Sequence, residues 1–308
     1  MPHRLPLALL CLSLLLGVSF LPGISSGADL PGKEDGPEAA TGKEGPSYLS
    51  RLWELEEEPG RRRSAITPYR GNYILPVTYN SSPNDGPARI SDPGKEMENL
   101  EVAFQISFKT RLWERILDGK TDLWVAYTQR SFWQLYDFAD SSPFRETNYE
   151  PEFLLNFRTD YDLLGFRGRY VNVGLNHQSN GRPEPLSRSW NRAVANVGFE
   201  RGDVVLVLNA WYRFPEDDVD DDNPGIERFM GYGQINLHYF RTGHRLGLSW
   251  RNNLRAGGNK GALQVEWSFP LLALVDGYVQ YFNGYGENLL DYNASSNRIG
   301  VGFILREW

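Results

Sequence analysis

The chain has 308 residues, of which 41% are hydrophobic and 13% aromatic, and it carries a net charge of −7. It shows no basic patch that would neutralise phosphates, so the composition disfavours a nucleic-acid partner. Its one cysteine, Cys11, excludes stabilisation by an internal disulfide.

Residues 1–28 have the layout of a secretory signal peptide. Arg4 begins the segment, an apolar run covers residues 5–21, and the small residues 26–28 precede Asp29. We expect cleavage after residue 28, which would also remove the cysteine. A retained membrane helix is the weaker interpretation, because Pro22 and Gly23 end the apolar run.

Residues 29–66 are rich in glycine, proline and charged side chains. This composition predicts a flexible, periplasmic N-terminal segment without a strong structural preference.

Apolar and polar residues alternate through the rest of the chain, most regularly over residues 100–109, where every even-numbered residue is apolar. A period of two is typical of a β-strand with two unlike faces. The pattern predicts twelve strands, over residues 72–79, 100–113, 122–135, 150–160, 167–179, 187–200, 203–214, 227–241, 244–255, 260–270, 276–286 and 295–306.

The predicted connections alternate between tight turns, as at residues 202–203 and 242–243, and long polar loops, as at 136–149, 215–226 and 286–294. This arrangement is typical of barrels with short periplasmic turns and longer extracellular loops. The sequence therefore predicts an all-β fold, a twelve-stranded antiparallel transmembrane β-barrel over residues 67–308, in the outer membrane of a Gram-negative cell.

A soluble β-sandwich is the alternative, but it would bury the apolar rows and expose the polar ones. The polar rows favour a barrel, because they mix charges and amides that would hydrogen-bond inside a narrow lumen and largely plug it. These residues are Lys109, Arg130, Asn156, Arg158, Asn172, Arg192, Asn196, Asn209, Arg213, Asn236, Arg251 and Glu266. In the first strand Pro76 removes a backbone donor, so we expect a bulge there.

The hairpin over residues 167–200 carries the candidates for chemistry. His177 and Ser179 continue an outward apolar row that reaches Leu175, and Asn191 continues the outer row of the returning strand. In a symmetric hairpin Asn191 lies opposite His177. Ser179 would then be the nucleophile, His177 its base, and Asn191 the group that orients the imidazole. A chance pair of polar residues near the headgroups is the alternative.

The same hairpin resembles a known family. Residues 176–182, Asn-His-Gln-Ser-Asn-Gly-Arg, and residues 187–192, Ser-Arg-Ser-Trp-Asn-Arg, closely resemble the active-site hairpin of the outer-membrane phospholipase A family. Residues 127–129, 141–151, 284–287 and 291–293 also look like that family. The resemblance runs from about residue 70 to the end and does not include residues 29–66.

The resemblance implies hydrolysis of the acyl esters of phospholipids at either position, that is phospholipase A1 and A2 activity, and of lysophospholipids. It gives His177, Ser179 and Asn191 the roles of base, nucleophile and orienter. It also implies a homodimer that becomes active when two chains assemble.

The resemblance further implies that the enzyme requires Ca²⁺. The ligands would be the backbone carbonyl of Arg182, the side chain of Ser187, and Ser141 of the partner subunit. The amide of Gly181, together with calcium-bound water, would stabilise the oxyanion. The residues alone predict no such site, and the acidic run over 216–222 is interpreted as a solvated surface loop.

Gln129 shares a lipid-facing row with apolar neighbours, so its amide needs a partner. Pairing with the same residue across a two-fold axis would satisfy the amide, and the resemblance implies a dimer interface there. A hydrogen bond to a neighbouring side chain is the alternative.

Two other classes of function stay open at this point. A porin-like transport barrel would need an unobstructed lumen. A structural or adhesive barrel would rely on the long outer loops.

Overall fold

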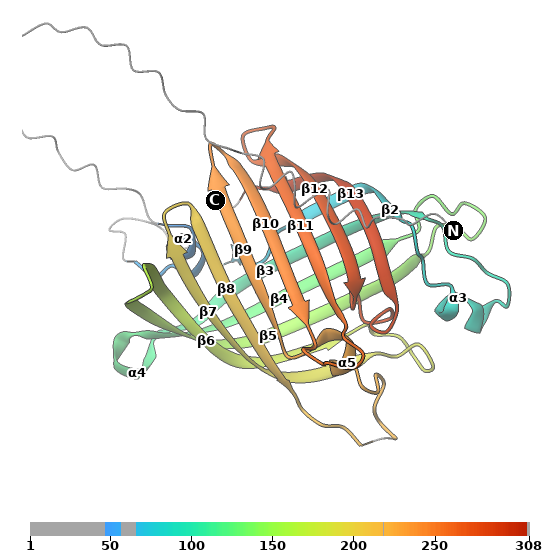
Figure 1. Cartoon of the computed structure of the whole chain (residues 1–308), viewed down its shortest axis with the longest axis horizontal. Coiled ribbons are helices and arrows are strands. Elements are labelled where there is room, and N and C mark those ends of the chain that lie inside the picture. Colours follow the sequence, from blue (N-terminus) through green and yellow to red (C-terminus); the bar gives the residue numbers. More distant parts are fainter. Residues whose placement is uncertain (1–46, 57–65, 218, 307–308) are drawn as a thin grey trace, which may run out of the picture. The chain divides into compact units, whose positions relative to one another are not determined.

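The structure is a computed structural model that describes residues 47–56, 66–217 and 219–306. The predicted signal peptide lies outside these residues. Within them, one antiparallel sheet of thirteen strands closes on itself (Figure 1). The strands are β1 (Thr67–Pro68), β2 (Tyr73–Asn80), β3 (Leu100–Arg115), β4 (Thr121–Trp133), β5 (Phe144–Leu163), β6 (Phe166–Ser179), β7 (Ser189–Arg201), β8 (Val204–Arg213), β9 (Gly233–Arg241), β10 (His244–Asn252), β11 (Gly261–Pro270), β12 (Val275–Tyr285) and β13 (Ser295–Leu305).

Strands β2 to β13 form the barrel, because each pairs with its neighbours in sequence and β13 pairs back onto β2. The two-residue strand β1 pairs only with β3 among the described strands. The twelve predicted strands are thus confirmed. In the described part of the chain four short helices accompany them: α2 (Tyr48–Trp53), α3 (Gly86–Ser91), α4 (Ile116–Gly119) and α5 (Glu227–Met230).

Two predicted boundaries were wrong. Strand β5 begins at Phe144, inside the predicted loop 136–149. The polar segment stays in the barrel wall because Arg145 forms ion pairs with the luminal carboxylates of Glu101 and Asp291. Residues 227–230, predicted to begin a strand, form α5. Met230 of this helix is buried with residues of two long loops and the start of β7.

The bulge expected at Pro76 is confirmed. The pairing of β2 with β3 shifts register between Leu75 and Thr78, and the pairing of β13 with β2 shifts between Val301 and Phe303. Both irregularities flank the proline, which has no N–H to give to either neighbour.

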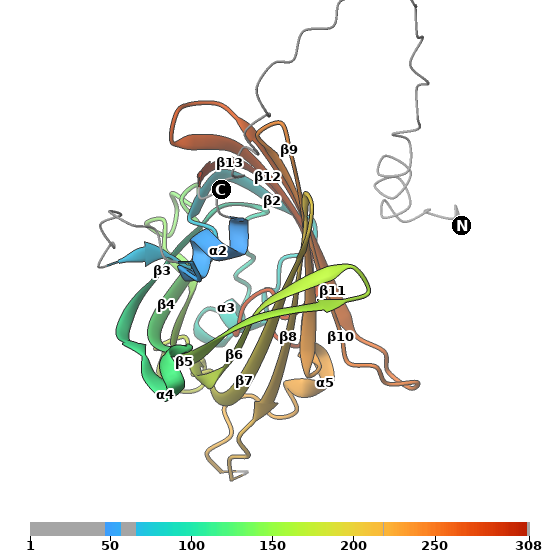
Figure 2. The same ribbon diagram turned by 90° about the vertical axis from the view of Figure 1, so that its left-hand side faces the viewer.

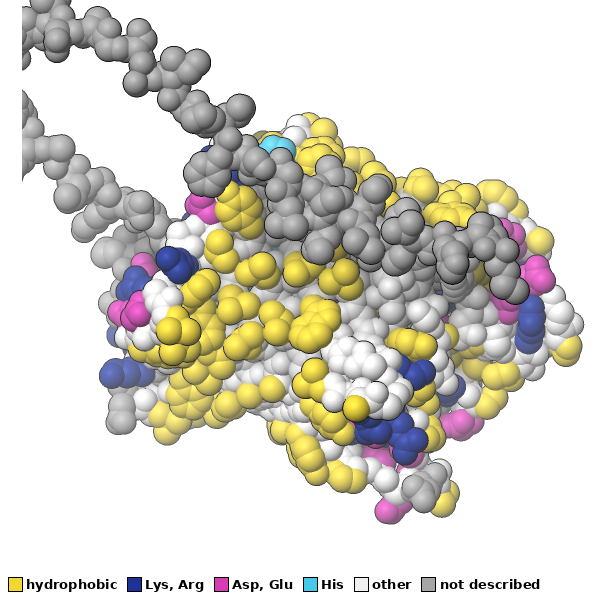
Figure 3. All heavy atoms as spheres, in the orientation of Figure 1, with side chains coloured by type: hydrophobic (Ala, Val, Ile, Leu, Met, Phe, Trp, Pro, Cys, Tyr) yellow, Lys and Arg dark blue, Asp and Glu magenta, His cyan; other side chains and the backbone are white. Residues whose placement is uncertain are grey.

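The barrel carries its apolar side chains outside. Figure 3 shows them spread over the strands of the visible face. Large exposed hydrophobic residues on the strands include Ile74, Val77, Ile106, Phe108, Phe153, Leu175, Leu208, Ile235, Trp250, Val301 and Phe303. This is the inverse of a soluble sandwich, so that alternative is excluded. None of the described helices is long and apolar enough to cross a membrane.

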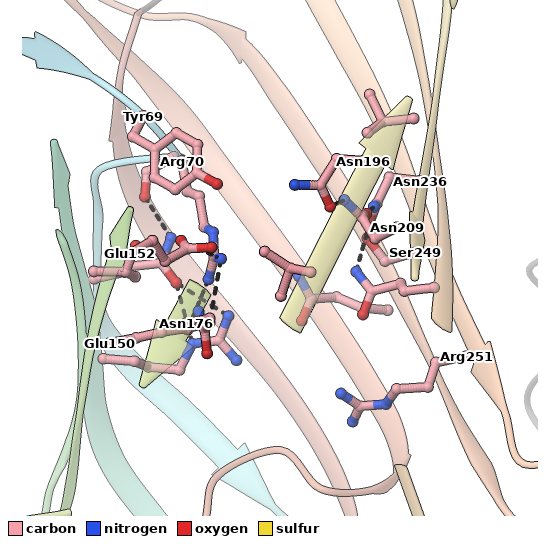
Figure 4. Close-up of a pocket in the computed structure, with 18 of the residues that line it drawn as sticks. Tyr69, Arg70, Glu150, Glu152, Asn176, Asn196, Asn209, Asn236, Ser249 and Arg251 are labelled. Atoms are coloured by element: carbon pink, nitrogen blue, oxygen red, sulfur yellow. Dashed lines mark hydrogen bonds and ion pairs between the residues drawn. The ribbon is translucent and has the colours of Figure 1, made fainter. Parts of the chain in front are cut away.

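The lumen is filled by hydrogen-bonded polar side chains, as predicted. Arg70 forms ion pairs of 2.8 Å with both Glu150 and Glu152, and Arg192 pairs with Glu150 at 3.0 Å. Asn176 donates to Glu150 at 2.8 Å (Figure 4). Glu150 therefore accepts hydrogen bonds from β6, from β7 and from Arg70, which precedes β2, and so links separate segments of the chain.

A second set of amides lines the opposite wall. Asn209 donates to Asn196 at 2.6 Å, and Ser249 donates to Asn236 at 2.7 Å. Between the two sets lies a cavity of about 350 Å³ into which Arg251 points (Figure 4). The interior is therefore a network with a small cavity.

Helix α2 lies inside the ring of strands (Figure 2). Ser47 caps it by accepting from the Ser50 N–H at 3.3 Å, and the Leu49 N–H donates to Glu200 at 2.7 Å. Glu200 lies near the end of β7, at the short-turn end of the barrel. The helix therefore occupies the end of the lumen opposite the long loops.

Trp53 anchors this helix. Its ring packs edge-on against Trp124, with 5.8 Å between centroids, and lies tilted against Tyr170 at 5.2 Å. The Lys109 ammonium lies 4.8 Å from the centre of the Trp53 ring. Residues 47–56 thus differ from the weakly structured segment that the composition predicted. A few apolar side chains that fill the barrel outweigh the surrounding charges.

We predict that Trp53→Ala lowers the free energy of unfolding by about 3–5 kcal/mol, because it empties a packed site at the end of the lumen. Urea unfolding in detergent micelles measures this. The control is Trp113→Ala, at a side chain that is 66% exposed. Equal stabilities of the two variants would contradict the anchoring role.

Removal of the central luminal carboxylate should also destabilise the barrel. Glu150→Ala leaves Arg192 without its ion-pair partner in the barrel interior, which should cost about 3 kcal/mol. The matched control is Glu96→Ala, whose side chain is 82% exposed and lies 3.9 Å from Arg89. The same unfolding assay applies, and a Glu150→Ala midpoint like that of the control would show that the network is dispensable.

Candidate active site

Strands β6 and β7 bring the predicted residues together at the long-loop end. In their register His177 lies opposite Asn191, and Ser179 lies opposite Ser189. His177 Nδ1 and Asn191 Oδ1 are 2.9 Å apart. The predicted pairing is therefore confirmed. With its proton on Nδ1, His177 donates to the asparagine and keeps Nε2 as the basic atom.

This pair lies on the outer face of the barrel. His177 and Ser179 are half-buried and continue the row of Leu175, whose side chain is 56% exposed. The residues between them, such as Asn176, point into the lumen. Alternation along one strand thus puts the candidate reactive side chains on the outer face and the polar side chains beside them in the lumen.

The luminal side chains beneath this hairpin are closely packed. Trp190 Nε1 donates to Gln178 at 2.8 Å, and the Arg192 guanidinium stacks 4.0 Å from the centre of the Trp190 ring. Arg192 is held in turn by Glu150. The luminal network therefore fixes both strands that carry the outer pair.

The loop after Ser179 is organised by Asn180. Its Oδ1 accepts from the N–H of Arg182 at 3.3 Å and of Arg188 at 3.0 Å, while its Nδ2 donates to the Leu186 carbonyl at 2.9 Å. Gly181 has a φ of +64°, and a Cβ there would lie 3.3 Å from the Tyr149 ring. A glycine is therefore required at position 181, directly after Asn180.

The proposed calcium ligands belong to two loops. Ser187 Oγ donates to the carboxylate of Asp222 at 2.6 Å, so the acidic run is not wholly a solvated loop. Glu184 is exposed beside Asp222, and hydrogen bonding with that carboxylate raises the pKa of Glu184, with desolvation and the like charge adding to the rise. Ser141 is exposed on the loop before β5, with a φ of 60°.

The groups around this loop suit a hard cation, because all of them offer oxygen. They are the Arg182 carbonyl, the hydroxyls of Ser187 and Ser141, and the neighbouring carboxylates of Glu184 and Asp222. No group of three or more His, Cys, Asp or Glu residues with metal-binding geometry occurs among the described residues.

Sequence reasoning missed the contribution of the loop between β8 and β9. Asn223 accepts from the Ser189 N–H at 3.1 Å and also donates to the Ser189 carbonyl, so it extends the edge of β7. Glu216 lies beside Asn191. The only sequence signal was the run of acidic residues, which does not reveal these contacts.

Gln129 lies on β4, in the same cross-strand row as Ser179: it pairs with Tyr149, which pairs with Ser179. Its Oε1 accepts from the Tyr127 hydroxyl at 3.2 Å, and its Nε2 donates to Ser131 at 3.3 Å. In the single chain the amide is thus satisfied by neighbours, as the alternative interpretation expected.

Comparisons with known proteins agree with this geometry. The family described as Phospholipase A1 matches residues 49–305. Phospholipase A1 of Klebsiella pneumoniae is 39% identical over 245 residues, which cover 79% of this chain and 82% of that protein. A putative phospholipase A1 of Neisseria meningitidis is 36% identical over 269 residues, covering 84% of this chain and 70% of that protein.

Solved structures give the same result. Outer membrane phospholipase A of Escherichia coli matches with a TM-score of 0.76 and 36% identity, covering 84% of this chain and 97% of that one. A calcium-bound dimer of the Salmonella typhi outer membrane phospholipase matches with the same TM-score and coverage at 37% identity. The chain therefore belongs to the phospholipase A1 family and is an outer-membrane β-barrel that hydrolyses phospholipid esters.

Proposed function

We propose that the chain cleaves the acyl esters of phospholipids at both positions, and of lysophospholipids, with a Ser179–His177–Asn191 triad on the outside of the barrel. The observation that carries this proposal is the 2.9 Å contact between His177 and Asn191 on the lipid-facing side of β6 and β7. The adjacent outward residue of β6 is a serine. An ester in the outer leaflet would approach from the bilayer and not through the lumen, which α2 and the polar network fill.

In the proposed reaction, His177 Nε2 removes the proton from Ser179 Oγ as the oxygen attacks the ester carbonyl carbon. The tetrahedral intermediate collapses when His177 returns the proton to the glycerol oxygen that leaves. Water, deprotonated by the same imidazole, then attacks the acyl-serine carbonyl. The bond between the acyl carbon and Ser179 Oγ breaks, His177 returns the proton to Oγ, and the fatty acid is released. Asn191 holds the ring throughout without adding a charge that lipid would make costly to bury.

Calcium would be held by Ser187 and the carbonyl of Arg182, with Ser141 of the partner subunit completing the set. The carboxylate of Asp222, 2.6 Å from Ser187 Oγ, would supply the negative charge that these neutral ligands lack. When bound, the ion would add positive charge beside the developing oxyanion. The Gly181 N–H, on the turn after the nucleophile, would donate to the same oxyanion.

The direct test compares wild type with Ser179→Ala in fatty-acid release from phospholipid micelles, with Ca²⁺ and with a chelator. We expect release only from wild type in Ca²⁺, with a rate at least about 1000-fold above the alanine variant. The control is Ser249→Ala, which changes a luminal serine. Equal release by wild type and Ser179→Ala would overturn the triad, and undiminished release with chelator would overturn the calcium requirement.

Dimerisation would complete the calcium site, because Ser141 would come from the partner subunit. It would also reach the triad, because Gln129 lies in the same cross-strand row as Ser179, two strands away. Adjacent strands are about 4.8 Å apart, so a partner seated on Gln129 would border the substrate groove. A chain alone would hold the triad but only part of the calcium site. Activity would thus depend on assembly.

We predict that Gln129→Leu weakens dimerisation in Ca²⁺-containing micelles by about three- to ten-fold, because an interchain amide pair is lost in a low-dielectric interface. Sedimentation equilibrium measures the change. Asn283→Leu, at an exposed position on β12, is the matched control. If both variants dimerise like wild type, this face is not the interface.

A further inference from the structure

A carboxylate outside the triad contacts its third member. Asn191 Nδ2 lies 3.5 Å from Glu216 Oε1, in donor geometry, while Asn191 Oδ1 faces His177 Nδ1 at 2.9 Å. The two ends of one amide therefore have different partners, one on β6 and one in the loop after β8.

The loop is held in place for this contact. The Phe214 N–H donates to the Asn191 carbonyl at 2.9 Å, which continues the pairing of β7 with the chain beyond β8. Arg213 donates to Glu216 Oε2 at 3.1 Å and pairs with Asp221, and its side chain is largely buried. The Glu216 carboxylate is thus fixed through one oxygen and presents the other to the asparagine.

An asparagine amide has two orientations that differ by a half-turn, and only one presents oxygen to His177. The reversed orientation would put its NH₂ against the histidine N–H and its oxygen against the Glu216 carboxylate, so both contacts would become repulsive. The carboxylate therefore selects the orientation in which Asn191 accepts from the imidazole.

We propose that Glu216 is a positioning residue for the reaction, which holds the Asn191 amide so that His177 keeps its proton on Nδ1. This inference rests on the proposed triad. The carboxylate also places a negative charge, relayed through the amide dipole, behind the imidazolium that forms in the transition state. A neutral asparagine thereby gains part of the effect that an aspartate would have.

The test is steady-state hydrolysis of phospholipid micelles in Ca²⁺ by Glu216→Gln, with rates expressed per folded barrel. We expect kcat to fall about two- to five-fold with KM unchanged, the size expected of a solvent-screened charge contact. Glu216→Asp, which keeps the charge, should recover part of the loss. The matched control Asp217→Asn removes an equal charge from the neighbouring exposed residue and should leave kcat unchanged.

Glu216→Gln in an Asn191→Ala background separates positioning of the amide from a disturbance of the loop. If Glu216 acts through the amide, Glu216→Gln has no further effect on kcat once Asn191 is absent. A loss that persists in this background, a loss equal to that of Asp217→Asn, or no loss at all would overturn the proposal. Failure of the triad itself is seen separately, as undiminished activity of Ser179→Ala.

Discussion

The structure depends on one constraint: inside a bilayer, backbone N–H and C=O groups have no water to bond, so the strands must satisfy one another. The pairing of β13 with β2 meets this requirement by closing the ring. Closure then decides where every side chain goes. Alternate residues face lipid and are mostly apolar. The residues between them face a narrow interior, where the described side chains form a polar network around a cavity and α2 packs at one end.

This division accommodates the proposed active site on the outside of a membrane barrel. His177 and Ser179 take two positions of an outward apolar row, while Asn176 and Gln178, which alternate with them along β6, join the luminal network. The barrel interior thus fixes the strands that carry the proposed reactive groups, as an apolar core would in a soluble enzyme. The adjacent loops add Asp222 beside Ser187 and Glu216 beside Asn191.

Much of this followed from the sequence, because a period of two and polar turns are local signals. They predicted the twelve strands, the bulge at Pro76 and the pairing of His177 with Asn191. Helix α2 was not predicted, since its six residues are too few for a helical period and only the finished barrel buries Trp53. The contacts of Asp222, Glu216 and Asn223 were missed because no local period shows which side chains of the β6–β7 hairpin the loop after β8 meets. The proposed calcium ligands came from the family resemblance alone, because no local pattern in this chain marks them.

The central claim is that Ser179 reacts with lipid on the bilayer side of the barrel. It is tested most directly by reconstituting the wild-type protein in vesicles with Ca²⁺ and a long-chain alkyl fluorophosphonate, whose phosphorus an activated serine attacks with loss of fluoride. Mass mapping of the modified peptides should find the adduct on Ser179 in wild type and none at this position in His177→Ala. An adduct on a different serine, or an unmodified Ser179 in protein that has lost its activity to the reagent, would contradict the account.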